Sequence, residues 1–186
     1  MTVPNVITLF RFLLVPLIVF FLLNGEWLWA LCGFVLAAIS DGLDGFIARH
    51  FNQRSVLGSY LDPIADKLLL VTVFVMLGYM GQLPLWLVIA AVSRDALIVG
   101  GVVLSTVMGN PVAMQPIFVS KANTAVQLVL ASLVLASLAL QVSPGLVLDA
   151  LVWLSGILTV ASGAAYLLAW IKHMGGYVDA GTASDK

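Results

Sequence analysis

The sequence predicts an all-α integral membrane protein with six transmembrane helices. Its 186 residues are 62% hydrophobic and only 9% charged, whereas a soluble domain carries charge on about a quarter of its residues. Six apolar runs approach or exceed the roughly 20 residues that cross a bilayer as a helix. These runs are too long and too continuously apolar for the alternating strands of a membrane β-barrel.

Turn signals separate the six runs and set their order along the chain. The breaks are Asn24-Gly25, the polar stretch 50–55, Gly81-Gln82 before Pro84, Gly109-Asn110-Pro111 and Ser143-Pro144-Gly145. They predict helices over residues 5–23, 27–49, 57–80, 83–107, 119–140 and 146–170. Since no linker or repeat divides the runs, we expect residues 1–174 to form a single six-span membrane domain and residues 175–186 a polar C-terminal tail.

Basic residues are distributed unequally between the two predicted sides of the membrane. With the N-terminus in the cytoplasm, that side holds His50, Arg54, Lys121, Lys172 and Lys186. The opposite loops hold Glu26 and Asp149 but neither Lys nor Arg, which satisfies the positive-inside rule. The first apolar run lacks the basic flank of a signal peptide, and no Arg-rich transit peptide precedes it. We therefore expect a cell inner (cytoplasmic) membrane protein with both termini in the cytoplasm.

Composition also disfavours two classes of partner or site. The net charge is −1 and basic runs are absent, which argues against nucleic acid as a partner. A single cysteine, Cys32, allows neither a disulfide framework nor a thiolate metal site. Because Cys32 lies in an apolar run, we expect a buried, inert thiol.

Four aspartates are concentrated in a 26-residue segment of this weakly charged chain. They are Asp41, Asp44, Asp62 and Asp66. Offsets of three and four put each pair on one helix face, and the short polar turn makes the two helices antiparallel neighbours. Clustered carboxylates in a low dielectric must be neutralised; Lys67 and Arg49 could neutralise two, and divalent cations all four. Oxygen ligands without Cys or His indicate Mg²⁺ or Mn²⁺ and not zinc.

Small residues accompany the first aspartate pair. Gly42 and Gly45 remove side chains where a bulky ligand such as a nucleotide would approach the helix, and Ala48 continues this small face. Tight helix packing is the alternative explanation for these glycines.

The complete spacing is Asp-x2-Asp-Gly-x2-Ala-Arg-x8-Gly-x3-Asp-x3-Asp, which we call the signature. It resembles, at every position, the signature of the CDP-alcohol phosphatidyltransferase family. The resemblance implies six transmembrane helices, a homodimer and a site with two divalent cations that opens to the cytoplasmic leaflet. It implies that Asp41, Asp44, Asp62 and Asp66 hold the cations. The first three would also contact CDP, with Gly45, Ala48, Arg49 and Gly58 shaping that part of the site.

The same resemblance implies the reaction. An acceptor hydroxyl attacks the β-phosphoryl group of a CDP-linked lipid, and CMP leaves. Paired cations would stabilise the developing charge, and Asp66 would be the general base that accepts the hydroxyl proton.

Charged groups inside the later runs are candidates for binding the acceptor. Arg94 in the fourth run, with Lys121 and Asn123 at the start of the fifth, would suit a phosphate on the second substrate. The alternatives are that Arg94 only holds helices together, through Asp95 or another aspartate, and that Lys121 extends to the interface. Adjacent residues on a helix face apart, which disfavours the Arg94–Asp95 contact.

A polar stripe opens the first run. Asn5, Thr8 and Arg11 recur at intervals of three, and we expect them to line the acceptor or nucleotide cavity. Capping and helix packing are the alternatives.

Within the family, the signature together with "SRDALIVGG" and "SKANTAVQL" resembles the CMP-forming cardiolipin synthases. That group joins CDP-diacylglycerol to phosphatidylglycerol and releases CMP, so both substrates are lipids of the bilayer. The alternative is a phosphatidylglycerophosphate synthase acting on glycerol 3-phosphate, although those relatives more often carry Arg-Glu in the fourth run. A transporter with an intramembrane acidic relay is disfavoured, because all four acids lie in one segment.

Overall fold

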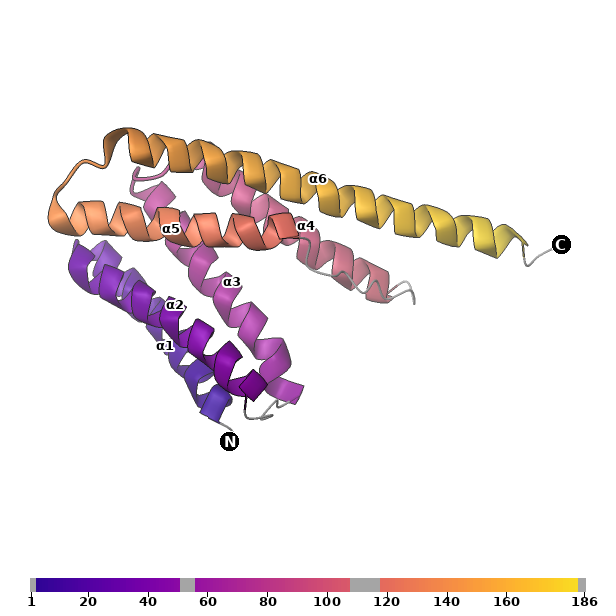
Figure 1. Cartoon of the computed structure of the whole chain (residues 1–186), viewed down its shortest axis with the longest axis horizontal. Coiled ribbons are helices and arrows are strands. Elements are labelled where there is room, and N and C mark those ends of the chain that lie inside the picture. Colours follow the sequence, from indigo (N-terminus) through magenta and orange to yellow (C-terminus); the bar gives the residue numbers. More distant parts are fainter. Residues whose placement is uncertain (1–2, 51–55, 108–117, 184–186) are drawn as a thin grey trace.

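Six α-helices, without a strand, make up the part of the chain that the computed structural model describes (Figure 1). The structure describes the backbone of residues 3–50, 56–107 and 118–183, and the side chains of residues 9–40, 65, 67–105 and 118–171. The helices are α1 (Val3–Leu23), α2 (Trp27–His50), α3 (Val56–Tyr79), α4 (Leu85–Val107), α5 (Phe118–Leu140) and α6 (Gly145–Ala183). The predicted bounds are confirmed to within two residues at every end except the last.

Apolar length supports a membrane location for these helices. Over the described residues, three helices contain stretches long and apolar enough to cross a bilayer: Leu85–Ser105, Phe118–Leu140 and Gly145–Ile171. Over the same described residues, the apolar stretches of α1, α2 and α3 are shorter. Large apolar side chains such as Leu13, Phe20 and Ile89 are exposed on the outside of the bundle, where a membrane protein contacts lipid.

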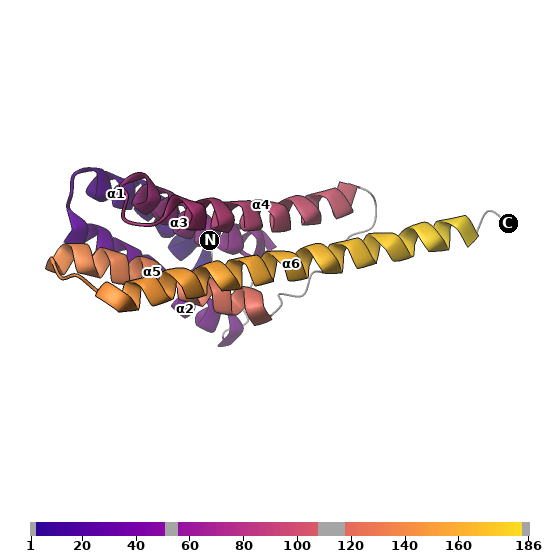
Figure 2. The ribbon, with the colours of Figure 1, turned by 90° about the horizontal axis from the view of Figure 1, so that it is seen from above.

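Two expectations differ from the structure. Residues 175–183, expected within a polar tail, continue α6, which extends beyond the other helices (Figures 1 and 2). Each glycine costs only about 1 kcal/mol in a helix interior, and extending an existing helix requires no new nucleation. Cys32 is exposed and not buried, because it lies on a side of α2 that faces away from the bundle.

α1 and α3 end in the same backbone motif. Gly25, at φ 73°, donates its N–H to the Leu22 carbonyl at 3.1 Å, and Glu26 donates to Phe21 at 2.9 Å. Gly81, at φ 72°, closes α3 with an equivalent pair of bonds. This left-handed conformation favours glycine, so the predicted turn glycines fix where these helices stop.

The helices pack as a closed ring in the order α1, α2, α5, α6, α4 and α3, with α3 returning to α1. Besides its two neighbours in the ring, α3 contacts α2 and α5, so over the described residues it packs against every other helix except α6. The first five helices alternate in direction, so that α2 ends and α3 begins at one end of the bundle (Figure 1). We call this the motif end, because both halves of the signature lie there.

The core lies along the inner faces of these helices. It is formed by buried aliphatic and aromatic side chains from every helix, including Ile18, Leu22, Phe34, Val73, Phe74, Leu77, Leu87, Leu130, Leu135 and Val152. The close approach of α3 and α4 needs a glycine. A Cβ atom at Gly78 would lie 2.7 Å from the Val88 Cγ2 atom and 3.5 Å from its Cβ atom.

We predict that Gly78→Ala destabilises the protein by about 1–3 kcal/mol, the usual cost of overpacking a core. Val88 is buried and its β-branched side chain is stiff, so it cannot turn away. Gly100→Ala is the matched control, because a Cβ atom there meets no heavy atom within 4 Å. Unfolding in mixed micelles, followed by tryptophan fluorescence, measures both. Equal effects of the two substitutions would contradict the close approach.

Candidate active site

The signature is divided between α2 and α3 at the motif end. α2 carries Asp41, Asp44, Gly45, Ala48 and Arg49, and α3 carries Gly58, Asp62 and Asp66. The side chains of these eight residues, and those of Asn5 and Thr8, lie outside the side chains that the structure describes. Among the described side chains, no group of three His, Cys, Asp or Glu residues could hold a metal. The metal and CDP assignments therefore stay predictions.

Helical register predicts an inward location for the aspartate positions of α2. Ala30, Phe34 and Ala37 are buried at intervals of four and three. The same alternation continues to positions 41 and 44, which carry the first two aspartates. Residues at these intervals share one helix face.

α3 has the corresponding arrangement. Leu77, Val73 and Leu70 are buried at intervals of four and three, and the same register continues to positions 66 and 62. Since α2 and α3 pack together, the register supports a common location for the four acidic positions. The donor set is wholly carboxylate, which fits hard divalent cations.

Arg11 brings a buried positive charge to this half of the bundle. Its side chain is 1% exposed, and α1 packs against α2 and α3. Arg11 lies one helical turn before Leu14 and Val15 on the buried face of α1, so the predicted polar stripe is inward at this position.

Arg94 is the centre of a polar cluster that joins four helices. Its Nη1 atom donates to the Asp95 Oδ1 atom at 2.5 Å. From α6, Ser162 Oγ accepts from Nη2 at 2.7 Å and from Nε at 3.2 Å. From α5, Ser120 Oγ accepts from Nη2. The Arg94 Cζ atom lies 5.9 Å from the ring centroid of Tyr166, within cation–π range.

Asp95 extends this cluster to α3. Its Oδ1 atom accepts a second bond from the Lys67 Nζ atom at 2.5 Å. The expectation that adjacent residues would hold Arg94 and Asp95 apart is therefore wrong, because the long arginine side chain folds back to its neighbour. Lys67 and Arg94 share the single carboxylate of Asp95, so these three residues together carry a net positive charge. Lys67 directly follows Asp66 in the sequence. The Lys67 side chain is 40% exposed and is the accessible cation of the group.

Burial decides what Arg94 does. The residue is 5% exposed, and its donors are directed to side chains of α4, α5 and α6. This arrangement favours the alternative in which Arg94 holds helices together. Ser120, Ser162 and Tyr166 were not singled out in the sequence, although a buried arginine requires such partners.

Asn123 and Lys121, which were expected to bind the second substrate together, lie in different surroundings. Asn123 is completely buried, and its Oδ1 atom accepts from the Thr159 Oγ1 atom at 3.0 Å. Gln127 donates to the same hydroxyl at 3.4 Å, so these residues join α5 to α6. Lys121 is exposed at the start of α5. Of this element, Ser120 is the residue that bonds to Arg94.

We predict that Asp95→Asn lowers the free energy of unfolding by about 3 kcal/mol, as expected when one partner of a buried ion pair is removed. Lys67 and Arg94 would lose the anion that they share. The control is Asp149→Asn, the same substitution at an exposed position of α6, with a change within about 0.5 kcal/mol. Unfolding in mixed micelles measures both, and equal values would argue against the cluster as a structural tie.

Comparison with known proteins shows what this sequence is similar to. The sequence profile described as CDP-alcohol phosphatidyltransferase matches residues 1–167. The chain is 34% identical to the human protein named cardiolipin synthase (CMP-forming), over 89% of this chain and 60% of that protein. The rat protein of the same name gives the same values. A Streptomyces coelicolor protein of that name is 38% identical over 53% of this chain and 48% of its own length.

The chain thus spans about 60% of the length of its human and rat relatives. The matched profile covers all of α1 to α5 and most of α6, and includes every residue of the signature. The chain belongs to the CDP-alcohol phosphatidyltransferase family.

Proposed function

We propose that this protein is a CMP-forming cardiolipin synthase, which transfers a phosphatidyl group from CDP-diacylglycerol to phosphatidylglycerol and releases CMP. The observation that carries the proposal is the complete signature, which α2 and α3 carry at one end of the bundle. The names of relatives that align with about nine-tenths of the chain support this choice of reaction.

The donor would bind at the signature. Two divalent cations, Mg²⁺ or Mn²⁺, held by the four aspartates would offset the negative charge of the diphosphate during transfer. Asp41, Asp44 and Asp62 would also contact CDP. The remaining signature residues would shape the nucleotide site: Gly45, Ala48, Arg49 and Gly58.

The transfer itself exchanges one phosphorus–oxygen bond for another. The acceptor hydroxyl oxygen bonds to the phosphorus that carries diacylglycerol, and the bond from that phosphorus to CMP breaks. CMP leaves with the electron pair. Asp66 accepts the hydroxyl proton as general base. The contact of Lys67 with Asp95 restrains α3 next to this carboxylate, so Asp95 and Arg94 act as positioning residues.

The phosphate of the acceptor would meet lysine side chains of α3 and α5. Lys67 and Lys121 are accessible and suit a phosphate, whereas Arg94 is engaged by its neighbours. Asn5, Thr8 and Arg11 stay candidates for lining the cavity. Asn123 would contribute indirectly, by holding α5 against α6 through its hydrogen bond with Thr159. Glycerol 3-phosphate is the alternative acceptor, because the same two lysines would suit its phosphate.

We further propose an inner-membrane location with cytoplasmic termini, and assembly as a homodimer. The distribution of basic residues supports the orientation. In this orientation the motif end faces the cytoplasm, where CMP would be released.

The first test of function is CMP release by the purified chain in liposomes. With labelled CDP-diacylglycerol and Mg²⁺ or Mn²⁺, we predict CMP and cardiolipin when phosphatidylglycerol is supplied, and loss of both with EDTA. Release with glycerol 3-phosphate alone would replace the cardiolipin reaction with the alternative. If no CMP were released with any combination of the two acceptors and the two metals, the proposed enzymatic activity would be overturned.

The second test addresses the general base. We predict that Asp66→Asn lowers kcat by about 10²- to 10⁴-fold, the usual contribution of general acid–base catalysis. Binding of CDP-diacylglycerol, measured by calorimetry, should persist because three signature aspartates are retained. Asp149→Asn is the control and should turn over normally. Normal turnover by Asp66→Asn would remove this residue from the proton-transfer step.

A further inference from the structure

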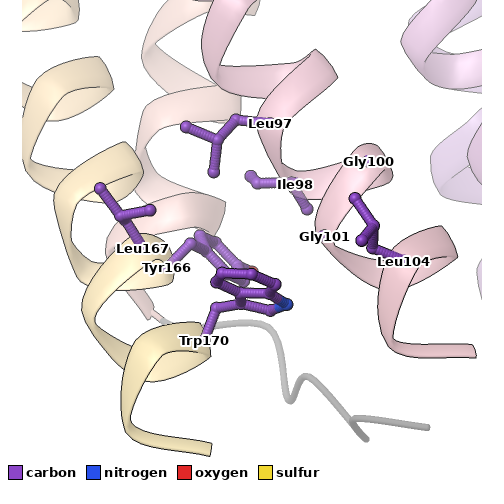
Figure 3. A pocket seen from close by; sticks show the side chains of 8 residues that line it. All are labelled: Leu97, Ile98, Gly100, Gly101, Leu104, Tyr166, Leu167 and Trp170. Carbon is purple, nitrogen blue, oxygen red and sulfur yellow. The ribbon is translucent and has the colours of Figure 1, made fainter. Parts of the chain in front are cut away.

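An apolar cavity of about 270 Å³ lies between α4 and α6 (Figure 3). Its walls include Leu97, Ile98 and Leu104 from α4 and Tyr166, Leu167 and Trp170 from α6. The volume is just below the roughly 300–1,000 Å³ of small-molecule pockets, so the cavity suits part of a ligand. Because its lining is almost wholly apolar, a hydrocarbon occupant is favoured over water.

Two glycines create space on the α4 side. Gly100 and Gly101 both line the cavity. A Cβ atom at Gly100 would meet no heavy atom within 4 Å, so this space is open where a side chain would otherwise project. A larger residue at this position would fill the cavity without first displacing a neighbour.

One polar group interrupts the apolar walls. The Nε1 atom of Trp170 is buried, and no hydrogen-bond acceptor is found for it among the residues that the structure describes. Figure 3 shows the indole nitrogen on the side of the ring that faces α4. A buried donor without an acceptor is costly. The occupant that satisfies this site is therefore apolar along its length, with an acceptor oxygen near Trp170.

The depth of the cavity matches a phospholipid in the bilayer. In the sequence, Trp170 lies two residues before Lys172, and Leu104 lies five residues before the turn signal Gly109-Asn110-Pro111, so both are near the ends of their apolar runs. Leu97 and Tyr166 lie farther from these ends along their helices. The seven residue steps from Leu97 to Leu104 span roughly 10 Å of helix. An ester carbonyl at the membrane interface would meet Trp170, and its acyl chain would run inward along the cavity.

We infer that this cavity binds an acyl chain of the acceptor phospholipid, whose ester carbonyl accepts a hydrogen bond from Trp170. This inference rests on the proposed function for the choice between the two lipids. The donor nucleotide is assigned to α2 and α3, and α2 contacts neither α4 nor α6 over the described residues. Tyr166 is shared between the cavity and the Arg94 cluster, which joins the cavity to the acceptor side of the site.

The test uses the full chain in nanodiscs and phosphatidylglycerol with a photoreactive group on one acyl chain. Mass spectrometry should find labels in peptides covering residues 97–104 and 166–170. Phosphatidylcholine with the same photoreactive chain, at equal mole fraction, should give several-fold less label there. Gly100→Phe should lower the phosphatidylglycerol label and raise the KM for phosphatidylglycerol by about tenfold, with an unchanged KM for CDP-diacylglycerol.

Two variants guard against unfolding and indirect effects. Gly100→Ala should keep the label, because a methyl group leaves most of the cavity open. Trp170→Phe keeps a ring but removes the N–H donor, and should lower the label by about fivefold. Thermal unfolding midpoints close to that of the parent protein establish that each variant is folded.

Several outcomes would overturn the inference. Equal labelling by both lipids would identify general bilayer contact, and cross-links to a second copy of the chain would identify a dimer surface. Retained labelling in both Gly100→Phe and Trp170→Phe would place the chain elsewhere. Labelling requires no turnover: selective label without CMP release overturns the proposed reaction alone, whereas normal release without label overturns the cavity assignment alone.

Discussion

The buried charge of Arg94 imposes the constraint on which the arrangement of the later helices depends. A guanidinium inside an apolar bundle must find its partners within the protein. Arg94 obtains them from Asp95 on its own helix, Ser120 on α5 and Ser162 on α6. Because Asp95 is shared with Lys67 on α3, a single set of contacts fixes four helices relative to one another. Sliding α3 by one turn would break the contact with Lys67.

This restraint connects the two functional halves of the molecule. The signature lies on α2 and α3, whereas the cations assigned to the acceptor lie on α3 and α5. Lys67 belongs to both halves, because it follows Asp66 and contacts α4. Phosphoryl transfer depends on holding acceptor, donor and base in register. A rigid link between α3 and α4 is therefore a physical requirement of the proposed reaction, in addition to its contribution to stability.

The bilayer surrounds the folded helices and would also deliver the proposed lipid substrates. Exposed apolar side chains face outward on every helix, so the proposed lipid substrates can approach the bundle from the side. The cavity between α4 and α6 offers such a lipid an apolar wall with one N–H donor at Trp170. Glycines have different roles at the two helix contacts. Gly78 lets α3 approach α4 closely, whereas Gly100 keeps space open.

The sequence by itself determined the six helices and the signature, because apolar runs, turn glycines and fixed spacings are local properties. It also located both acid pairs on single helix faces. It did not determine the pairing of Arg94, the position of Asn123 between α5 and α6, or the exposed side of Cys32. Those features depend on which helix faces meet and on how long side chains fold across several helices. Only the tertiary structure decides this, because burial leaves each polar group few partners and the packing selects among them.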